Sequence, residues 1–185
     1  MATNLELKCR VKSLEAMHAA AWSLGIQPIE VLIQTDVYFD VPHGRLKLRR
    51  IDGKTAELIQ YDRVDAPSAR WSRFYRYEVR DPQSLEGMLT RALGLRGVVR
   101  KRRTLYLYGP VRIHLDEVED LGSFLEFEIV ETSEEESRAM MERLKTTFSI
   151  QSEDVIGGSY IDLLEKSKAP ACGLIVNPSA SPVFE

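Results

Sequence analysis

The sequence is poor in cysteine, since only Cys9 and Cys172 occur among its 185 residues. Cys9 lies in an alternating apolar stretch and Cys172 in a segment rich in Pro, Ala and Ser, so the two give neither a disulfide framework nor a zinc pattern. No apolar run reaches the roughly 18 residues that a membrane helix needs. A basic segment followed by an apolar one, which marks a secretory signal, is also missing. These absences predict a cytoplasmic protein without a membrane partner.

An excess of basic residues is also absent, because 25 Lys and Arg stand against 28 Asp and Glu and the net charge is −3. This balance excludes a globally basic nucleic-acid binder, and Trp22 and Trp71 form no stacking platform with the basic residues. A glycine-rich loop of the Walker or Rossmann kind is missing, which excludes a phosphate cradled at a helix terminus. The chain instead has many charges of both signs, sorted by position along its strands.

Alternation of apolar and polar residues predicts a first strand over residues 4–11. Seven further strands are predicted at 31–40, 45–51, 55–63, 73–79, 98–108, 111–117 and 125–130. Capping residues and apolar stripes predict helices at 14–24, 82–93, 134–148 and 160–166. Tight turns between neighbouring strands favour antiparallel pairing, which makes an α+β protein. We expect one domain over residues 1–168 and a poorly ordered tail at 169–185.

Four predicted strands carry unusually uniform charged faces. The residues that share one face of each strand are Arg45, Lys47 and Arg49; Lys101 and Arg103; Arg112, His114 and Asp116; and Glu126 and Glu128. For any single strand, a solvated outer face is the ordinary explanation. A row of like charges is repulsive, however, unless opposite charges face it. We therefore interpret these faces as the interior of a closed, eight-stranded antiparallel barrel or tunnel, with the helices packed outside on its apolar faces.

A tunnel lined by both signs of charge suits a metal-bound triphosphate. Lysine and arginine neutralise phosphoryl oxygens, arginine through a bidentate fork. Carboxylates do not bind phosphate directly, but they hold Mg²⁺ or Mn²⁺, which bridges to it. Side chains on strands are also more rigidly placed than those on loops, which favours preorganised charge stabilisation.

Several segments resemble the CYTH superfamily of triphosphate tunnel metalloenzymes, and within it the class IV adenylyl cyclase lineage. The first strand of that family reads E-x-E-x-K, and here residues 4–8 read N-L-E-L-K. Further matches are T-D-V-Y-F-D-V-P-H-G-R-L-K-L-R at 35–49, V-V-R-K-R-R at 98–103, R-I-H-L-D-E-V-E-D-L-G-S-F-L-E-F-E at 112–128 and Y-I-D-L-L at 160–164. The resemblance spans residues 4–166 in consistent order and implies an eight-stranded antiparallel tunnel.

The resemblance also implies roles for the charged residues. Glu6, Glu126 and Glu128 take metal-ligand positions for Mg²⁺ or Mn²⁺, with Asp116 as a further acidic site. The positions that grip the triphosphate are those of Lys8, Lys47, Arg49, Lys101, Arg103 and Arg112. Asp116, assisting proton removal, and Lys8 are the expected catalytic residues. His114 shares the strand face of Asp116, either as a hydrogen-bonding residue or as a direct participant.

Asn4 departs from the family pattern, in which a glutamate at this position helps to hold the metal. An asparagine offers a neutral carbonyl oxygen and no charge, so we expect weaker binding of divalent ions and altered or lost catalysis. An ordinary strand start would explain Asn4 equally well.

Three functions follow as alternatives. The first is cyclisation of ATP to cyclic AMP and pyrophosphate, and the second is hydrolysis of inorganic or organic triphosphate, as in thiamine triphosphatases. The third is a non-catalytic module that binds a triphosphate or nucleotide, because Asn4 replaces the family glutamate. Ser159 and Tyr160 either lie at the tunnel mouth or simply cap and pack a helix. The family often forms dimers, although no exposed apolar patch in the sequence marks a homodimer interface.

Overall fold

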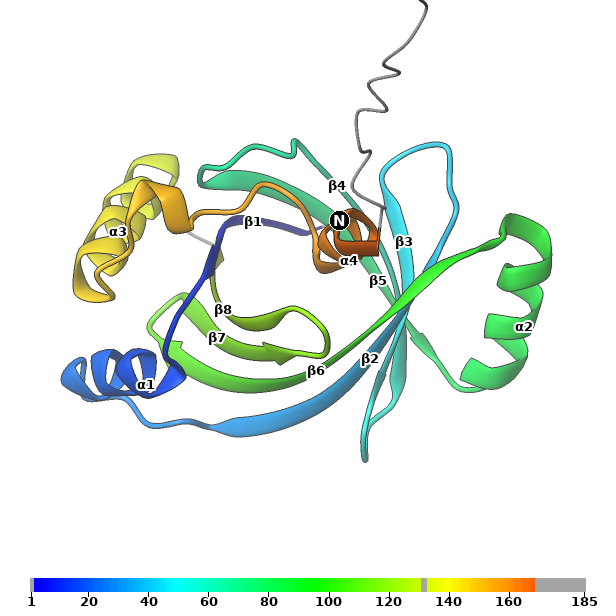
Figure 1. Ribbon diagram of the computed structural model, residues 1–185, viewed down its shortest axis with the longest axis horizontal. Coiled ribbons are helices and arrows are strands. Elements are labelled where there is room, and N and C mark those ends of the chain that lie inside the picture. The colour runs from blue at the N-terminus through cyan, green and yellow to red at the C-terminus, as the bar shows by residue number, and fades with distance from the viewer. Residues whose placement is uncertain (1, 131–132, 169–185) are drawn as a thin grey trace, which may run out of the picture.

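Eight antiparallel strands close into a barrel in the computed structural model, which describes residues 2–130 and 133–168 (Figure 1). The strands are β1 (Ala2–Arg10), β2 (Glu30–Phe39), β3 (Arg45–Ile51), β4 (Ala56–Arg63), β5 (Arg70–Val79), β6 (Leu95–Tyr108), β7 (Val111–Val118) and β8 (Gly122–Val130). Their order around the barrel is β1-β5-β4-β3-β2-β6-β7-β8, and β1 closes it by pairing with both β5 and β8. The predicted antiparallel α+β tunnel is therefore confirmed.

Three strands begin three residues earlier than the sequence predicts. β5 starts at Arg70, β6 at Leu95 and β8 at Gly122. In each case a neighbouring strand supplies a partner: Arg70 lies opposite Glu6, Leu95 opposite Phe39 and Gly122 opposite Val118. Pairing across the barrel thus extends strands into segments whose own residues favour a loop.

Three helices pack on the outer wall, as predicted: α1 (Leu14–Ser23), α2 (Pro82–Leu93) and α3 (Glu134–Thr147). α3 begins with the predicted capping box of Ser133 and Glu136. Its Met141 and Leu144 pack with Phe148 against the outward side chains of β1, β7 and β8. Leu85 and Leu89 of α2 cover the outward face of β2 and β3. The apolar faces of the strands are therefore outside and the charged faces inside.

The fourth helix, α4 (Tyr160–Lys168), follows one turn of 3₁₀ helix (η1, Ser152–Asp154) and corrects the expectation that all helices pack outside. Tyr160, Ile161 and Leu164 are buried among inward residues of the barrel, such as Tyr38 and Phe124. Figure 1 shows α4, in orange, at one end of the barrel. The apolar side chains of α4 pack there because that end of the interior is aromatic and aliphatic.

Gly97 of β6 permits the close approach of α4. A Cβ atom at this position would come within 2.7 Å of Ile161 Cδ1. Among the described residues, no helix is long and apolar enough to cross a membrane. The predicted tail at 169–185, with Cys172, lies outside the described residues.

Candidate active site in the barrel interior

The charged rows predicted from the sequence converge inside the barrel. Ten charged or ionisable side chains there are almost fully buried: Glu6, Lys8, Asp36, Lys47, Arg70, Lys101, Arg103, His114, Asp116 and Glu126. All of these except Arg70, His114 and Asp116 line a cavity of about 110 Å³ at the α4 end. A second hollow at the other end shares Arg49, Arg76, Arg103 and Glu128 with this cavity. The two hollows therefore adjoin each other in the barrel interior, which is lined by both signs of charge.

Asp36 of β2 gathers three cations on one side of the tunnel. Arg49 donates to both of its carboxylate oxygens at 2.7 Å, and Lys47 and Lys101 lie at 3.0 and 2.9 Å. Burial alone would raise the pKa of Asp36, but the charges of Arg49, Lys101 and Lys47 outweigh it and hold that pKa well below its usual range. One carboxylate for three cations leaves this wall with a surplus of positive charge, which suits a polyanion.

Burial also brings the pKa values of both lysines close to neutral pH. Desolvation, followed by the charge of Arg49, lowers the pKa of Lys47 to about 8. Desolvation lowers the pKa of Lys101 to about 7, because the attraction of Asp36 only partly offsets it and Arg49 and Arg103 add repulsion. Both side chains therefore gain charge readily when an anion enters the tunnel.

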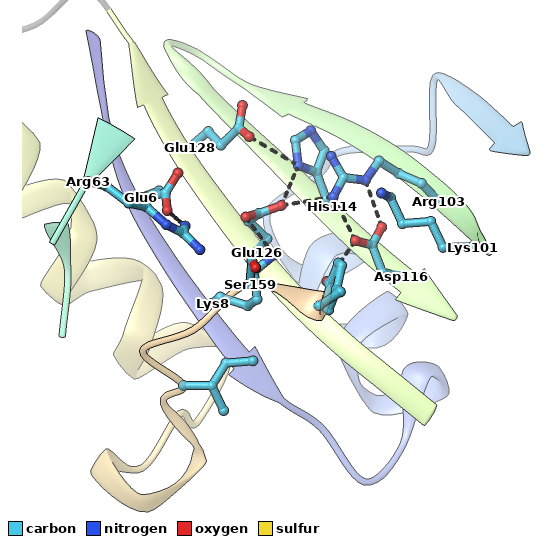
Figure 2. Close-up of polar contacts among 12 residues, drawn as sticks. Glu6, Lys8, Arg63, Lys101, Arg103, His114, Asp116, Glu126, Glu128 and Ser159 are labelled. Atoms are coloured by element: carbon cyan, nitrogen blue, oxygen red, sulfur yellow. Dashed lines mark hydrogen bonds and ion pairs between the residues drawn. The ribbon is translucent and has the colours of Figure 1, made fainter. Parts of the chain in front are cut away.

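Arg103 of β6 connects the cationic wall to the acidic one. Its guanidinium donates to both oxygens of Asp116, at 2.7 and 2.6 Å, and to Glu126 at 2.8 Å (Figure 2). Tyr160 donates to Asp116 at 2.8 Å, and the Nζ of Lys8 lies 2.7 Å from Glu126. Burial opposes the ionisation of Asp116, yet the charge of Arg103 lowers its pKa to about 2. Asp116 is therefore a weak proton acceptor that fixes the position of Arg103.

The predicted metal ligands do not all come together. Glu126 and Glu128 of β8 lie with His114 of β7 so that one ligand atom from each is within 4.8 Å of the others. Glu6 lies across the sheet from Glu128, but it is in contact with Arg63 and lies 3.2 Å from Arg70. The structure thus supports two of the four predicted carboxylates as neighbours in one site.

The predicted phosphate-binding residues line the tunnel at different depths. Lys8, Lys47, Lys101 and Arg103 are buried, and Arg49 is mostly buried on the same wall. Arg112 lies in the second hollow, where its side chain is 39% exposed and 3.8 Å from Glu128. An anion held by the buried set would therefore meet Arg112 at the opposite mouth.

Three charged residues with buried side chains in the interior were not predicted from the sequence: Asp36, Arg63 and Arg70. Asp36 lies within the quoted 35–49 segment, and its alternation with Gln34 and Tyr38 was the available signal. Arg70 was assigned to a loop because the strand was expected to start three residues later. Desolvation and the charge of Arg70 lower the pKa of Arg63 to about 10. Arg63 is still protonated at neutral pH, so both arginines place positive charge beside Glu6.

Asn4 lines the same cavity, at the position where the family pattern has a glutamate. The side chain is 4% exposed, and its Oδ1 has no hydrogen-bond partner. The same holds for Nδ1 of His114, which is also buried. Unpaired buried acceptors are rare in folded proteins, so both atoms point to a ligand of the tunnel.

The CYTH domain family model matches residues 2–160 of the chain. The chain belongs to the CYTH family. It is 29% identical to adenylate cyclase CyaB of Aeromonas hydrophila over 177 residues, which cover 89% of this chain and 90% of that protein.

Solved structures agree with this membership. The PH1012 protein from Pyrococcus horikoshii OT3 superposes on this CYTH protein with a TM-score of 0.79 at 28% identity, covering 86% of this chain and 98% of PH1012. The HpAC1 protein from Hippeastrum shares the fold, with a TM-score of 0.66 at 18% identity and coverage of 91% and 97% of the two chains.

Proposed function

We propose that this CYTH protein is a metal-dependent enzyme that acts on a triphosphate, with ATP cyclisation as its specific reaction. The observation that carries the proposal is the surplus of buried cations around Asp36, which faces the carboxylates and imidazole of β7 and β8 across one closed tunnel. A polyanion of several phosphoryl groups balances the cations, and a divalent ion balances the carboxylates. Glu126 and Glu128 are the carboxylates that would hold Mg²⁺ or Mn²⁺, whereas Glu6 and Asp116 are ion-paired to arginines.

The role of each residue follows from the wall of the tunnel on which it lies. Lys47, Arg49 and Lys101 bind the phosphoryl oxygens from one wall, and Arg103 binds them from the junction of the two walls. Asp116 keeps the guanidinium of Arg103 oriented through its bidentate contact. Lys8, 2.7 Å from Glu126, carries positive charge to the acidic wall. When bound, a divalent ion supplies Lewis-acid polarisation of phosphoryl oxygen.

In the cyclisation, the ribose 3′-oxygen forms a bond to the α-phosphorus while the bond from that phosphorus to the bridging oxygen of pyrophosphate breaks. The buried cations stabilise the departing pyrophosphate, since its negative charge increases as the bond breaks. The proton of the hydroxyl needs an acceptor. Asp116 is the predicted one, although its pKa of about 2 favours an orienting role. Lys101, with a pKa of about 7 in the free protein, becomes fully charged when a polyanion raises that pKa, and it therefore acts as a phosphate-binding cation.

Two observations bear on the choice of nucleotide substrate. Tyr38, Ile59, Tyr61 and Phe74 line the α4 end of the cavity and offer an apolar surface for a nucleoside. The 29% identity to adenylate cyclase CyaB supports the same reaction. The second candidate is a triphosphatase, favoured by the small volume of about 110 Å³ that α4 leaves at its end. The Hippeastrum structure is described as revealing a dominant triphosphatase activity for that protein.

³¹P NMR of the protein with ATP or inorganic triphosphate, in Mg²⁺ and then in Mn²⁺, tests the proposal. A cyclic phosphodiester signal together with pyrophosphate is the expected result, and free phosphate would favour the triphosphatase. Glu126→Gln should abolish either conversion, because the substitution removes a carboxylate from the acidic wall. Shifted resonances without conversion would favour the binding module that Asn4 suggests. Unperturbed spectra of both substrates would contradict the triphosphate tunnel altogether.

Binding of inorganic triphosphate is expected to take up protons. Lys101 and Lys47 have pKa values of about 7 and about 8 in the free protein, and a polyanion raises both. Apparent affinity should therefore be highest below pH 7 and fall as the pH rises through 7 to 8 and beyond. Isothermal titration calorimetry at pH 8 in two buffers of different ionisation enthalpy measures the proton uptake. Binding enthalpies that do not depend on the buffer would contradict the expectation.

A further inference from the structure

We propose that His114, Glu126 and Glu128 form a mixed nitrogen–oxygen metal site, and that this site takes a first-row transition-metal dication such as Zn²⁺ or Co²⁺ in preference to Mg²⁺. The inference rests on the proposed function and specifies its metal. It differs from the all-carboxylate set expected from the sequence, in which His114 had no defined role.

The three side chains are held together by the register of two neighbouring strands. His114 lies directly opposite Glu126 across the β7–β8 pair, and Glu128 is the next inward residue along β8. Ligand atoms from the three residues lie within 4.8 Å of one another. Figure 2 shows the imidazole of His114 beside both carboxylates, joined to each by a dashed line. Because strands position these groups, their spacing is fixed by the barrel and not by a loop.

The imidazole nitrogen that faces the carboxylates makes no hydrogen bond of normal length to either of them. Nδ1 of His114 lies 3.6 Å from Glu126 and 3.9 Å from Glu128, distances too long for hydrogen bonds. The side chain is 5% exposed, and Nδ1 has no hydrogen-bond partner. A merely structural histidine would be expected to use this nitrogen in a hydrogen bond. An ion between the three groups gives the nitrogen a partner without any change in fold.

Charge neutralisation near the carboxylates disfavours a hard cation. Glu126 already has Lys8 at 2.7 Å and Arg103 at 2.8 Å, while Arg112 lies 3.8 Å from Glu128. Asn4 contributes no charge where the family pattern has a glutamate. Binding of Mg²⁺ depends on oxygen ligands and their negative charge. A transition-metal ion gains in addition from the imidazole nitrogen, a ligand type that suits Zn²⁺, Ni²⁺ and Cu²⁺.

The test compares metal affinities of wild-type protein and His114→Asn by calorimetry, with Zn²⁺ and Mg²⁺ as probes. Many protein sites bind Zn²⁺ more tightly than Mg²⁺. The informative quantity is therefore the change that the substitution causes in the ratio of the two affinities. We expect the substitution to weaken Zn²⁺ binding at least ~10–100-fold, the cost of losing even an outer-sphere partner. Affinity for Mg²⁺ should stay within about twofold, because magnesium favours oxygen ligands. His43→Asn, in an exposed turn, is the matched control and should leave both affinities unchanged.

A second measurement needs no variant. Pulsed electron paramagnetic resonance of Mn²⁺-loaded wild-type protein should show coupling to ¹⁴N of an imidazole, and the coupling should persist in His43→Asn. His114→Asp should move the affinity ratio toward Mg²⁺, because it replaces nitrogen by a carboxylate oxygen.

Failure of this inference is distinguishable from failure of the proposed function. If ¹⁴N coupling is absent and the zinc-to-magnesium ratio does not respond to position 114, the inference is wrong. If inorganic triphosphate is nevertheless converted in Mg²⁺, the proposed function stands. If the site binds Zn²⁺ through His114 but no triphosphate is bound or converted, the metal site stands and the proposed function is wrong.

Discussion

Arg103→Met is expected to lower the free energy of unfolding by about 3–5 kcal/mol, the cost of removing one partner from a buried ion cluster. The guanidinium satisfies Asp116 at both oxygens and Glu126 at one. Without it, Asp116 keeps only the hydroxyl of Tyr160, and Glu126 keeps Lys8. Methionine fills much of the volume, so the loss reports the uncompensated carboxylates and not a cavity. Urea unfolding at pH 7 measures the difference.

The control for this prediction is the neighbouring residue on the opposite face of β6. Arg102 has a half-exposed side chain 3.7 Å from Glu117, and Arg102→Met should change stability by no more than about 0.5 kcal/mol.

The difference between wild type and Arg103→Met should also depend on pH. Asp116 has a pKa of about 2 in the folded protein, below its unfolded value. Its contribution is therefore present above the unfolded value of about 3.9 and is lost as the pH falls toward 2. The variant lacks this contribution, so the two unfolding curves should converge in acid. A stability loss below about 1 kcal/mol at pH 7 would show that the carboxylates do not depend on Arg103.

Lys101→Met is expected to separate activity from stability. Turnover of the triphosphate should fall by about 100-fold or more, the usual effect of removing one preorganised donor to developing negative charge. Stability at pH 7 to 8 should instead rise. Asp36 retains the bidentate contact of Arg49 and the ammonium of Lys47, so it stays paired. Methionine avoids the cost of burying the ammonium, which is the largest cause of the low pKa of Lys101.

The stability of the wild-type protein should itself depend on pH through Lys101. The pKa of Lys101 is about 7 in the folded protein and about 10.4 in an unfolded chain. The unfolded state therefore binds more protons between these values, and wild-type stability should gain from Lys101 as the pH rises through that window. Lys101→Met should flatten this part of the profile. Arg100→Met, on the exposed face of the same strand, serves as the control. A variant that is both less stable and fully active would contradict the assignment.

Most of the barrel was predictable because the alternation of polar and apolar residues along a strand indicates which residues share a face. Arg45, Lys47 and Arg49 alternate with apolar residues; Lys47 and Arg49 line the tunnel, and Arg45 pairs with Asp65 and Asp162 beside α4. The early start of β5 was not predictable, because Arg70 becomes part of a strand only through its pairing with Glu6. A single segment carries no information about its distant partner.

The site was predictable in composition but not in pairing. Alternation placed Glu126 and Asp116 in the interior, yet it did not show that Arg103 would join them. His114 and Glu128 are 14 positions apart in the sequence and become neighbours only through the register of β7 and β8. Three cations contact Asp36 because β2 lies between β3 and β6 in the barrel. This strand order cannot be read from the sequence of a single segment.

The closure of the barrel by β1 has a consequence for how the chain is made. β1 is synthesised before the other seven strands, but its two partners are β5 and β8, and its pairing with β8 extends to Val130. The barrel is thus an open sheet until nearly all of its strands have been synthesised, and such long-range closure slows folding. During that interval β1 presents Glu6, Lys8 and Arg10 along its free edge. Charged edge strands resist pairing with other chains. We therefore expect Glu6 and Lys8, which later line the tunnel, also to protect the unfinished protein from aggregation.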